Sequence, residues 1–474
     1  MGNRITGARV RRAGAAVALG ALLAGCGPWQ IALVSTNAAG TDSADSASLL
    51  PDISPDGTKV VFESWADNLG PTDTNHTTDV YLRDLTTGRT TLVSANPAGV
   101  AGDGESQLGW FSPDGTKVVF DSSAKDLTPV PAPNMGLYVR DLASGTTTLV
   151  SGDHATSGAG GFSPDGTKIV WGEQWSSGQN PGVFETDLAT GTITRLAQGR
   201  WPTYAPTGHT VAYVDGDQVW ILDVATGAVT QASAGAPGRT AFGLAFSSDG
   251  RRLAFTRQGT STEDIYVYDL VAKTTKLVTA ARTGGGGATG TGTTGTTLIG
   301  FAPGDGNRVL FYSRAGNLVA GDTNGVEDVF VRNIANSTTR LVSQTPSGTA
   351  GRAASTMAKW LGPSRVAFVS LAGDLGPTDQ NTAYDVYVRD LVAGTTTLVS
   401  ANAAGTGSGA GQSGGFDWPA AGLSTIFELS TSRDGTKIAF GSEASDLGPV
   451  DTPRSGDQPI RHDIYVATFV PPPA

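Results

Sequence analysis

Three loops carry acidic and amide side chains at a spacing that suits a hard cation. Each has an Asp, an Asn two positions later and an Asp six positions after the first: Asp73, Asn75 and Asp79; Asp322, Asn324 and Asp328; Asp379, Asn381 and Asp385. Ca²⁺ binds six to eight oxygens, so calcium is the cofactor that this pattern would hold. The same side chains would equally well hydrogen-bond to their own loop backbone. The Gly and the bidentate Glu of an EF-hand loop are absent, and both explanations stay open.

Two further segments match functional motifs in their letters but not in their context. Residues 411–415, GQSGG, match G-x-S-x-G, which requires a strand-to-helix turn. Residues 290–295, GTGTTG, match G-x-G-x-x-G, but no helix or acidic residue follows in the required place. Both lie in tracts of small residues, which we interpret as low-complexity sequence. We assign no catalytic residue and predict that the protein is not an enzyme.

The histidines and the loop tryptophans give no sharper prediction. The four histidines lie in different parts of the chain without the spacing of metal ligands: His76, His154, His209 and His462. His76 and His462 would come together if the chain closed on itself, although we interpret such proximity as chance. Three tryptophans in predicted loops, Trp65, Trp175 and Trp418, would stack on a sugar or peptide or pack within the fold. The ligand-binding residues remain unassigned.

These residues are carried by a repeat whose clearest copy is SPDGTKVVF at 54–62. Close copies begin at residues 112, 163 and 432, and weaker copies lie at 206–214, 247–255, 303–311 and 362–369. Ser, Pro, Asp and Gly suit the four positions of a tight turn, with Gly57 at positive φ. The β-branched and aromatic residues that follow predict a strand. Eight copies of one turn and one strand indicate a repeat fold.

A second motif alternates with the first, as in DVYLRDLTTGRTTLVS at 79–94. It predicts two short strands joined by a polar hairpin. With the apolar run before each SPDG turn, every repeat has four strands, here called a, b, c and d in chain order. The SPDG turn joins a to b, and the DLTTG turn joins c to d.

The two ends of the chain indicate how the repeats are arranged. The last repeat has an a strand near 425–430, a b strand and a c strand at 464–469, but it lacks d. Residues 31–40, IALVSTNAAG, match the segment that follows a c strand at 397–405 and would supply the missing strand. Such a strand closes a ring and removes a sheet edge. We therefore predict an all-β propeller of eight four-stranded antiparallel blades at 30–470, with seven blades as the alternative.

The combination of SPDG, a KVVF-type strand, DVYVRDL and TTLVS resembles the TolB-like, PD-type β-propeller repeats of exported bacterial proteins. The resemblance covers nearly the whole chain after residue 30 and implies an interaction role near the cell envelope. It implies no particular activity, because propellers host many functions.

In this arrangement all long insertions fall on one face of the ring. The a-to-b and c-to-d turns are short and share what we call the turn face. The b-to-c and d-to-a connections share the opposite, loop face, and the long ones are 65–78, 122–136, 315–327, 371–384, 443–462, 95–107, 279–297 and 401–421. Because irregular loops commonly carry function, we expect a ligand at the loop face.

The first 25 residues have the features of a lipoprotein signal peptide. A basic region is followed by a short apolar run that ends in Leu-Ala-Gly-Cys, and Cys26 is the only cysteine of the chain. We predict cleavage before Cys26, acylation of Cys26, a tether at 26–29 and a short tail at 471–474. Cleavage removes four of the 32 basic residues and leaves 28 against 43 acidic ones, a net charge near −15.

The composition and the leader together bound the function. An acidic surface repels nucleic acid and anionic lipid, so the expected membrane contact is through the lipid alone. We expect a monomeric, extracytoplasmic binding module for a protein, a peptide or a glycan. The alternative is a hydrolase or lyase with two carboxylates close together at the mouth of the propeller channel.

Overall fold

The computed structural model describes residues 28–471 except 72, 131–133, 155, 175–180, 260–261, 283–294, 377–378, 419–422, 428 and 449–461. Every regular element in these ranges is a β-strand. No helix in the described part of the chain is long and apolar enough to cross a membrane. The predicted leader, the lipidation residue Cys26 and Trp175 lie outside the described residues.

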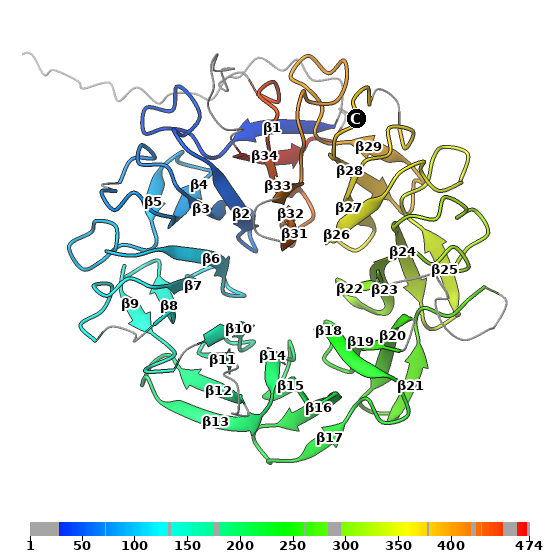
Figure 1. Cartoon of the computed structure of the whole chain (residues 1–474), viewed down its shortest axis with the longest axis horizontal. Coiled ribbons are helices and arrows are strands. Elements are labelled where there is room, and N and C mark those ends of the chain that lie inside the picture. The colour runs from blue at the N-terminus through cyan, green and yellow to red at the C-terminus, as the bar shows by residue number, and fades with distance from the viewer. Residues whose placement is uncertain are drawn as a thin grey trace, which may run out of the picture.

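The strands form eight four-stranded antiparallel sheets arranged in a ring (Figure 1). We call the space between the inner strands of the ring the central channel. From the inner to the outer strand, blades 1 to 4 are β2 (Ser48–Ile53), β3 (Lys59–Ser64), β4 (Asp79–Asp84) and β5 (Thr90–Leu92); β6 (Ser106–Phe111), β7 (Lys117–Ser122), β8 (Gly136–Asp141) and β9 (Thr147–Leu149); β10 (Thr156–Phe162), β11 (Lys168–Glu173), β12 (Gly182–Asp187) and β13 (Ile193–Gln198); and β14 (Arg200–Tyr204), β15 (Thr210–Asp215), β16 (Gln218–Asp223) and β17 (Val229–Gln231).

Blades 5 to 8 follow the same plan. Their strands are β18 (Arg239–Phe246), β19 (Arg252–Gln258), β20 (Glu263–Asp269) and β21 (Thr274–Leu277); β22 (Thr297–Ala302), β23 (Asp305–Ser313), β24 (Asp328–Asn333) and β25 (Thr338–Leu341); β26 (Ser355–Leu361), β27 (Arg365–Ser370), β28 (Asp385–Asp390) and β29 (Thr396–Leu398); and β32 (Leu429–Thr431), β33 (Lys437–Ser442), β34 (Asp463–Phe469) and β1 (Trp29–Leu33). The prediction of eight blades is confirmed, including the blades whose turns have lost the SPD letters.

The N-terminal strand closes the ring as predicted. β1 pairs with β34 from Trp29 opposite Phe469 to Leu33 opposite Tyr465. Just beyond this pairing, the Ser35 hydroxyl donates to Asp463 at 2.7 Å. The same Ser-to-Asp hydrogen bond joins strands d and c within blades 1, 6 and 7. Blade 8 is therefore completed by residues more than 400 positions away, in the geometry of an ordinary blade.

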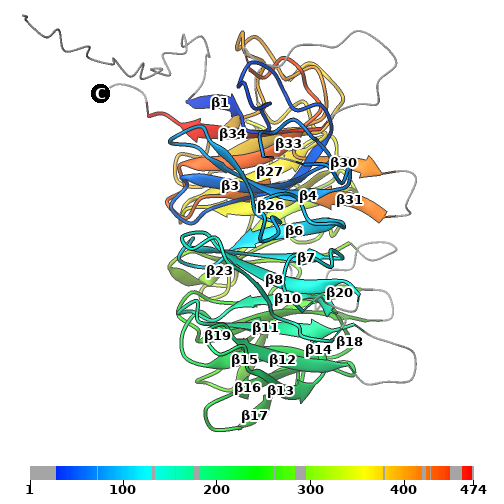
Figure 2. The ribbon, with the colours of Figure 1, turned by 90° about the vertical axis from the view of Figure 1, so that its left-hand side faces the viewer.

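The inner strand of blade 8 differs from the prediction of an a strand near 425–430. It begins at Ser413, which bridges to Ser442. A separate hairpin, β30 (Gly415–Trp418) and β31 (Leu423–Phe427), then interrupts it before β32 resumes at Leu429. The other inner strands carry a β-bulge near this position, for example between Leu49 and Asp52. The apolar run of β31 thus belongs to an inserted hairpin, which projects from the loop face (Figure 2).

The hydrophobic core consists of eight clusters, one between each pair of neighbouring blades. Strand b explains this arrangement, because successive side chains of a strand point to opposite faces. In β3, Val60 and Phe62 pack toward blade 8, and Val61 packs toward blade 2. Each blade is covered on both faces, so its b strand is continuously apolar. Each fully buried Val or Phe contributes roughly 1.5 to 3 kcal/mol.

The SPDG turn has the predicted chemistry. The Gly57 N–H donates to the Ser54 carbonyl at 2.8 Å, and Gly57 has a φ of 68°. The Ser54 hydroxyl donates to Asp56 at 2.6 Å and accepts the Lys59 N–H at 2.9 Å. The polar side chains of the repeat therefore hold the turn closed and start strand b in register.

Gly115 is the matching residue of the second copy, and its substitution tests this turn. Its φ is 71°, and an added Cβ would lie 3.4 Å from Pro55 of the neighbouring turn. We expect Gly115→Val to lower the free energy of unfolding by about 1 to 3 kcal/mol, because a β-branched residue is strained at positive φ. Urea denaturation measures this loss. Gly448→Val is the control, because Gly448 has open space around its Cβ position and no positive φ. Equal effects of the two substitutions would contradict the turn assignment.

Candidate functional site

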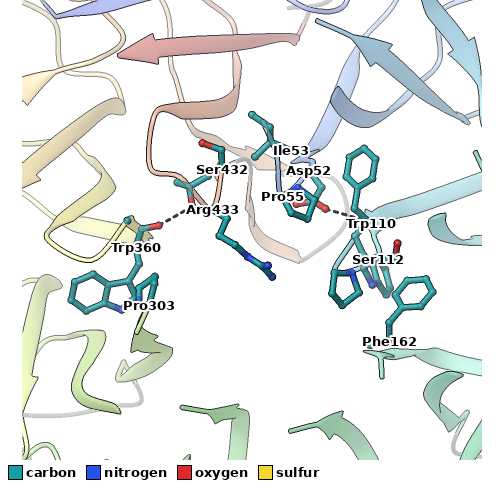
Figure 3. A pocket seen from close by; sticks show the side chains of 15 residues that line it. Asp52, Ile53, Pro55, Trp110, Ser112, Phe162, Pro303, Trp360, Ser432 and Arg433 are labelled. Carbon is teal, nitrogen blue, oxygen red and sulfur yellow. Dashed lines mark hydrogen bonds between the residues drawn. The ribbon is translucent and has the colours of Figure 1, made fainter. Parts of the chain in front are cut away.

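A cavity of about 460 Å³ opens at the turn-face end of the central channel (Figure 3). Inner strands and a-to-b turns of six blades line it, with side chains that include Asp52, Trp110, Phe162, Trp360 and Arg433. Our sequence analysis expects the ligand at the loop face. The cavity lies on the opposite face, among those turns.

The channel is asymmetric because one inner-strand position varies between blades. This residue pairs with Val61 or its equivalent in strand b. Blades 7, 1 and 2 carry charged or large side chains here, Lys359, Asp52 and Trp110, whereas blade 8 carries Ser430. Blades 3 to 6 carry small ones, Gly161, Thr203, Ala245 and Gly300. A Cβ at Gly161 would meet no atom within 4 Å, so the cavity is open on this side.

Arg433 reaches into this space from the a-to-b turn of blade 8. It stands where three of the other copies have Pro, at Pro55, Pro113 and Pro164. Its side chain is exposed and points into the cavity (Figure 3). The described residues give its guanidinium no hydrogen bond or ion pair. The single letter that departs from SPDG in the copy at 432 was the sequence signal for this residue, and our sequence analysis missed it.

Among the described lining residues, Asp52 is the one with a carboxyl group. It lies in blade 1 and hydrogen-bonds to blades 8 and 2. It accepts hydrogen bonds from the Ser430 hydroxyl at 2.8 Å and from the Phe111 N–H at 3.0 Å. Burial raises the pKa of Asp52, against the effects of these bonds and of the Lys359 charge. Lys359 is exposed to the channel, yet the channel walls surround it, and this burial lowers the pKa of its ammonium group.

The predicted calcium-binding residues form three separate groups at the loop face, one each in blades 1, 6 and 7. Within a group the side chains hydrogen-bond to one another or to their own loop. In blade 1, Asp73 accepts the Tyr81 hydroxyl at 2.7 Å and the Asn75 N–H at 3.3 Å. The Asn75 amide donates to Asp79 at 2.8 Å and to the Gly102 carbonyl at 2.6 Å. Because Gly102 lies in the connection to blade 2, this loop also fastens neighbouring blades.

The loop of blade 7 repeats these contacts. Tyr387 donates to Asp379 at 2.6 Å, Asn381 donates to the Gly409 carbonyl at 2.8 Å, and Ser400 donates to Asp385 at 2.5 Å. In the described ranges, no three His, Cys, Asp or Glu side chains are grouped as ligands of one ion. Calcium binding stays a prediction, with most of its proposed oxygens already used as hydrogen-bond acceptors.

Blade 6 departs from this pattern at one atom. Phe330 replaces the tyrosine, so the phenol hydroxyl that blades 1 and 7 supply is missing. Asp322 is 3% exposed, and neither of its oxygens accepts a hydrogen bond of ordinary length and angle. Burial raises the pKa of Asp322 to about 6, against the opposing effect of the nearby Asn324 N–H. Asn324 still donates to Asp328 at 2.7 Å and to the Gly351 carbonyl at 2.7 Å. Among the acids of these loops, Asp322 is therefore the one at which a new hydrogen-bond donor or a bound cation would stabilise the fold most.

Burial makes the second acid of each loop weak. It raises the pKa of Asp79 and of Asp328 to about 7 and that of Asp385 to about 8. Hydrogen bonds from Ser or Asn side chains oppose this rise, and the neighbouring acids Asp73, Asp322 and Asp379 add to it. We therefore expect these three aspartates to take up protons near neutral pH.

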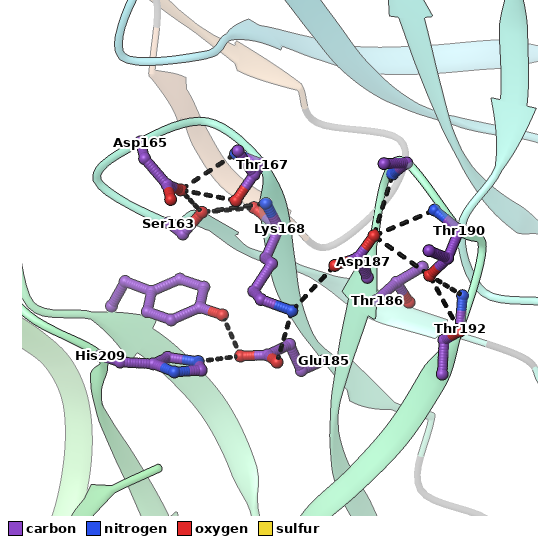
Figure 4. A network of polar contacts seen from close by, with 12 residues as sticks. Ser163, Asp165, Thr167, Lys168, Glu185, Thr186, Asp187, Thr190, Thr192 and His209 are labelled. Carbon is purple, nitrogen blue, oxygen red and sulfur yellow. Dashed lines mark hydrogen bonds and ion pairs between the residues drawn. The ribbon is translucent and has the colours of Figure 1, made fainter. Parts of the chain in front are cut away.

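A second polar cluster joins blades 3 and 4 at the turn face (Figure 4). Glu185, 6% exposed, accepts a hydrogen bond from Tyr204, and its Oε2 lies 2.5 Å from His209 Nε2. Lys168 Nζ lies 3.5 Å from the other Glu185 oxygen and 3.1 Å from Asp187. Burial alone would raise the pKa of Glu185, but the hydrogen bonds and charges of its partners outweigh burial and lower it. The cluster fastens two blades together.

The histidines and the serine of GQSGG, which the sequence analysis also considered, form contacts within the fold. Each histidine pairs with its own carboxylate, and His76 and His462 do so separately, with Asp67 at 2.6 Å and Glu443 at 2.9 Å. Ser413, the centre of GQSGG, is fully buried and bonds to the Ser442 hydroxyl at 2.8 Å. Trp65 is half-buried, whereas residues 290–294 and the Trp418 side chain lie outside the described part.

Comparison with known proteins finds similarity in fold. No protein-family model matches the chain. A prolyl endopeptidase structure is 13% identical with a TM-score of 0.48, covering 85% of this chain, which spans only 55% of that chain. An oligogalacturonate lyase in complex with manganese is 16% identical, covering 93% and 96% of the two chains, with a TM-score of 0.44. TolB from Acinetobacter baumannii is 14% identical, covering 88% and 78%, with a TM-score of 0.35.

Phe330→Tyr tests the unsatisfied acceptor in blade 6. We expect the free energy of unfolding to rise by about 1 kcal/mol, because the new hydroxyl can donate to Asp322 as Tyr81 does to Asp73. Tyr81→Phe is the matched reverse change and should lower stability by a similar amount. Urea denaturation in the presence of a chelator measures both. A Phe330→Tyr variant no more stable than the parent would contradict this account.

Thermal melts of the same variants, with added calcium and with a chelator, test the calcium prediction. A rise in melting temperature that Phe330→Tyr abolishes would support a cation at Asp322. An unchanged melting temperature in all variants would overturn calcium binding and leave the hydrogen bonds as the full role of these loops.

The weak acids of the loop face predict how stability depends on pH. Their folded-state pKa values of about 7 to 8 exceed the ordinary 3.8. Their protonated forms therefore stabilise the fold fully below pH 4, and this contribution is lost as the pH rises through 7 to 8. We expect Asp385→Asn to reduce the fall in unfolding free energy between pH 5.5 and 8.5 by about 1 to 3 kcal/mol. An unchanged pH profile would contradict the raised pKa.

Proposed function

We propose that this protein is an extracytoplasmic binding protein that holds a protein, peptide or glycan ligand at the turn-face mouth of its channel. The observation that carries the proposal is Arg433, a guanidinium without a partner among the described residues, which replaces the turn proline and points into the cavity. A charged side chain that the fold does not use is available for a ligand. This proposal transfers the expected binding site from the loop face to the turn face.

The residues that line the cavity favour a binding protein over a hydrolase or a lyase. The enzyme alternative requires two carboxylates close together at the channel mouth. Among the described lining residues Asp52 is the single carboxylate, and it is held by Ser430 and Phe111 of the neighbouring blades. Asp52 connects three inner strands through these hydrogen bonds, which suits a structural role. The described lining contains no second carboxylate that could act with it in acid–base chemistry.

Lipid anchorage at Cys26 forms part of the proposal and rests on the Leu-Ala-Gly-Cys motif. Cys26 precedes Trp29 by three residues, and Trp29 begins the outer strand of blade 8 at its turn-face end. Three extended residues span at most about 10 Å. An acyl group on Cys26 would therefore keep this edge of the turn face within reach of the membrane.

The experiment compares ligand capture by variants of the two faces. Acylated protein is recovered from the native envelope, and its co-purifying molecules are identified by mass spectrometry. We expect the doubly substituted Trp110→Ala, Arg433→Pro variant to lose the ligand at least ten-fold relative to the parent, because both cavity side chains are removed. Cys26→Ser should move the protein out of the membrane fraction.

Val130→Asp is the control for the opposite face, because Val130 is 72% exposed in a b-to-c loop. It should leave capture unchanged. Loss of the ligand from the Val130→Asp variant, with retention by the cavity variant, would overturn the turn-face site in favour of the loop face.

A further inference from the structure

We propose that the turn-face cavity takes the end of a peptide, with the terminal carboxylate on Arg433 and an apolar last residue against the surrounding side chains. This inference rests on the proposed binding function and names the ligand class of the same site. The ligand would be a short carboxy-terminal segment that enters the channel mouth.

Arg433 is suited to this role because the acid next to it in the turn and the acid of the cavity lining are already engaged. Asp434, the next residue of the turn, accepts hydrogen bonds from the Ser432 hydroxyl at 2.5 Å and the Thr436 N–H at 2.9 Å. Asp52 is held by its contacts to blades 2 and 8. The guanidinium fork is therefore left for an external group. A carboxylate can accept two parallel N–H bonds from it, and such pairs are among the stronger hydrogen bonds.

The rest of the lining selects an apolar neighbour for that carboxylate. Pro55, Pro113 and Pro303 line the cavity from three turns. Trp110 and Phe162 line one side of it (Figure 3). Apolar surface buried against these groups would contribute about 25 cal/mol per Å². The ligand must therefore combine a single anionic group with hydrocarbon, as the last residue of a peptide ending in Leu or Phe does.

The hydroxyl groups of the lining argue against a glycan. Ser112 and Ser432 donate to Asp114 and Asp434 of their own turns, and Thr431 donates to the Trp360 carbonyl at 2.8 Å. A sugar needs several polar partners for its hydroxyl groups, since unsatisfied polar groups are costly to bury. The hydroxyl groups of the described lining already donate hydrogen bonds within the protein. They could bind a sugar only if these bonds, which hold the turns, were broken.

The size of the cavity sets the length of the bound segment. At about 460 Å³ it falls within the range of small-ligand sites. It therefore accommodates about two or three residues and not a folded domain. A partner protein would contribute only its last residues to the cavity, and the remainder would lie outside the turn face.

The test uses two probes that differ in one group, acetyl-Ala-Ala-Phe with a free carboxylate and the same peptide as its carboxy-terminal amide. Calorimetry and Trp fluorescence measure their binding to the full chain. We expect the acid to bind at least ten-fold more tightly than the amide, as the loss of a charge-assisted hydrogen bond implies. Added salt should weaken the acid and not the amide.

The variants assign this preference to Arg433. Arg433→Pro restores the residue of the three other close copies, and we expect it to bind acid and amide within two-fold of each other. Because this change also removes the weak bond from the Arg433 N–H to the Pro55 carbonyl at 3.3 Å, Arg433→Ala is measured beside it. Arg433→Lys keeps the charge and should retain part of the preference. Arg251→Ala removes an exposed charge from another turn and should leave the preference intact.

Three results would overturn the inference. Equal binding of acid and amide to the parent protein would remove the carboxylate from the recognition. A uronic-acid trisaccharide that binds more tightly than the peptide acid, and loses affinity in Arg433→Ala, would make the ligand a glycan. Binding of neither peptide would reject the peptide class, and the envelope capture with the cavity variant would then decide separately whether the cavity binds any ligand.

Discussion

The ring depends on the requirement that every blade be covered on both faces. A single blade buries apolar side chains above and below its sheet, so it is stable only between two neighbours. Blade 8 meets this requirement through β1, which brings Val34 into the cluster that also contains Val60 of blade 1 and Ile464 of β34. Without that strand, β34 would have an open edge and two clusters would face water. Closure is therefore the contact on which the other seven interfaces depend.

The same requirement explains which parts of the fold could be predicted from the sequence. The SPDG turn and the KVVF strand are local, and their residues satisfy their own hydrogen bonds, so they give the same structure at each copy. The closing strand was also predictable, because residues 31–40 repeat a segment that follows strand c elsewhere. The inserted hairpin β30–β31 was not, because its apolar run is indistinguishable in sequence from an inner strand. Only the pairing of Ser413 with Ser442 shows where that strand begins.

The loop aspartates illustrate how two explanations share one sequence pattern. Oxygens spaced for a cation are also spaced to accept N–H and O–H groups of a loop, and spacing alone does not distinguish them. In blades 1 and 7 a tyrosine from strand c supplies the donor, eight residues after the Asp that accepts it. Phe330 breaks the pattern in blade 6, and the substitution was visible in the sequence. Its consequence was not, because the contact between Asp73 and Tyr81 emerges only when loop and strand are placed together.

The cavity arises where the symmetry of the repeat is broken. Eight identical blades would enclose a channel with eight-fold symmetry, and such a channel presents the same group from every side. This chain places Gly161, Thr203, Ala245 and Gly300 on one half of the ring and Lys359, Ser430, Asp52 and Trp110 on the other. The two glycines and Ala245 leave space, whereas Lys359 and Asp52 carry charge and Trp110 presents an aromatic surface. Arg433 adds a directed cation at the one close copy in which proline is missing. A few substitutions at equivalent positions of a repeat therefore suffice to make the lining of its channel asymmetric. In this way a repeat protein can form a specific site from the blades alone.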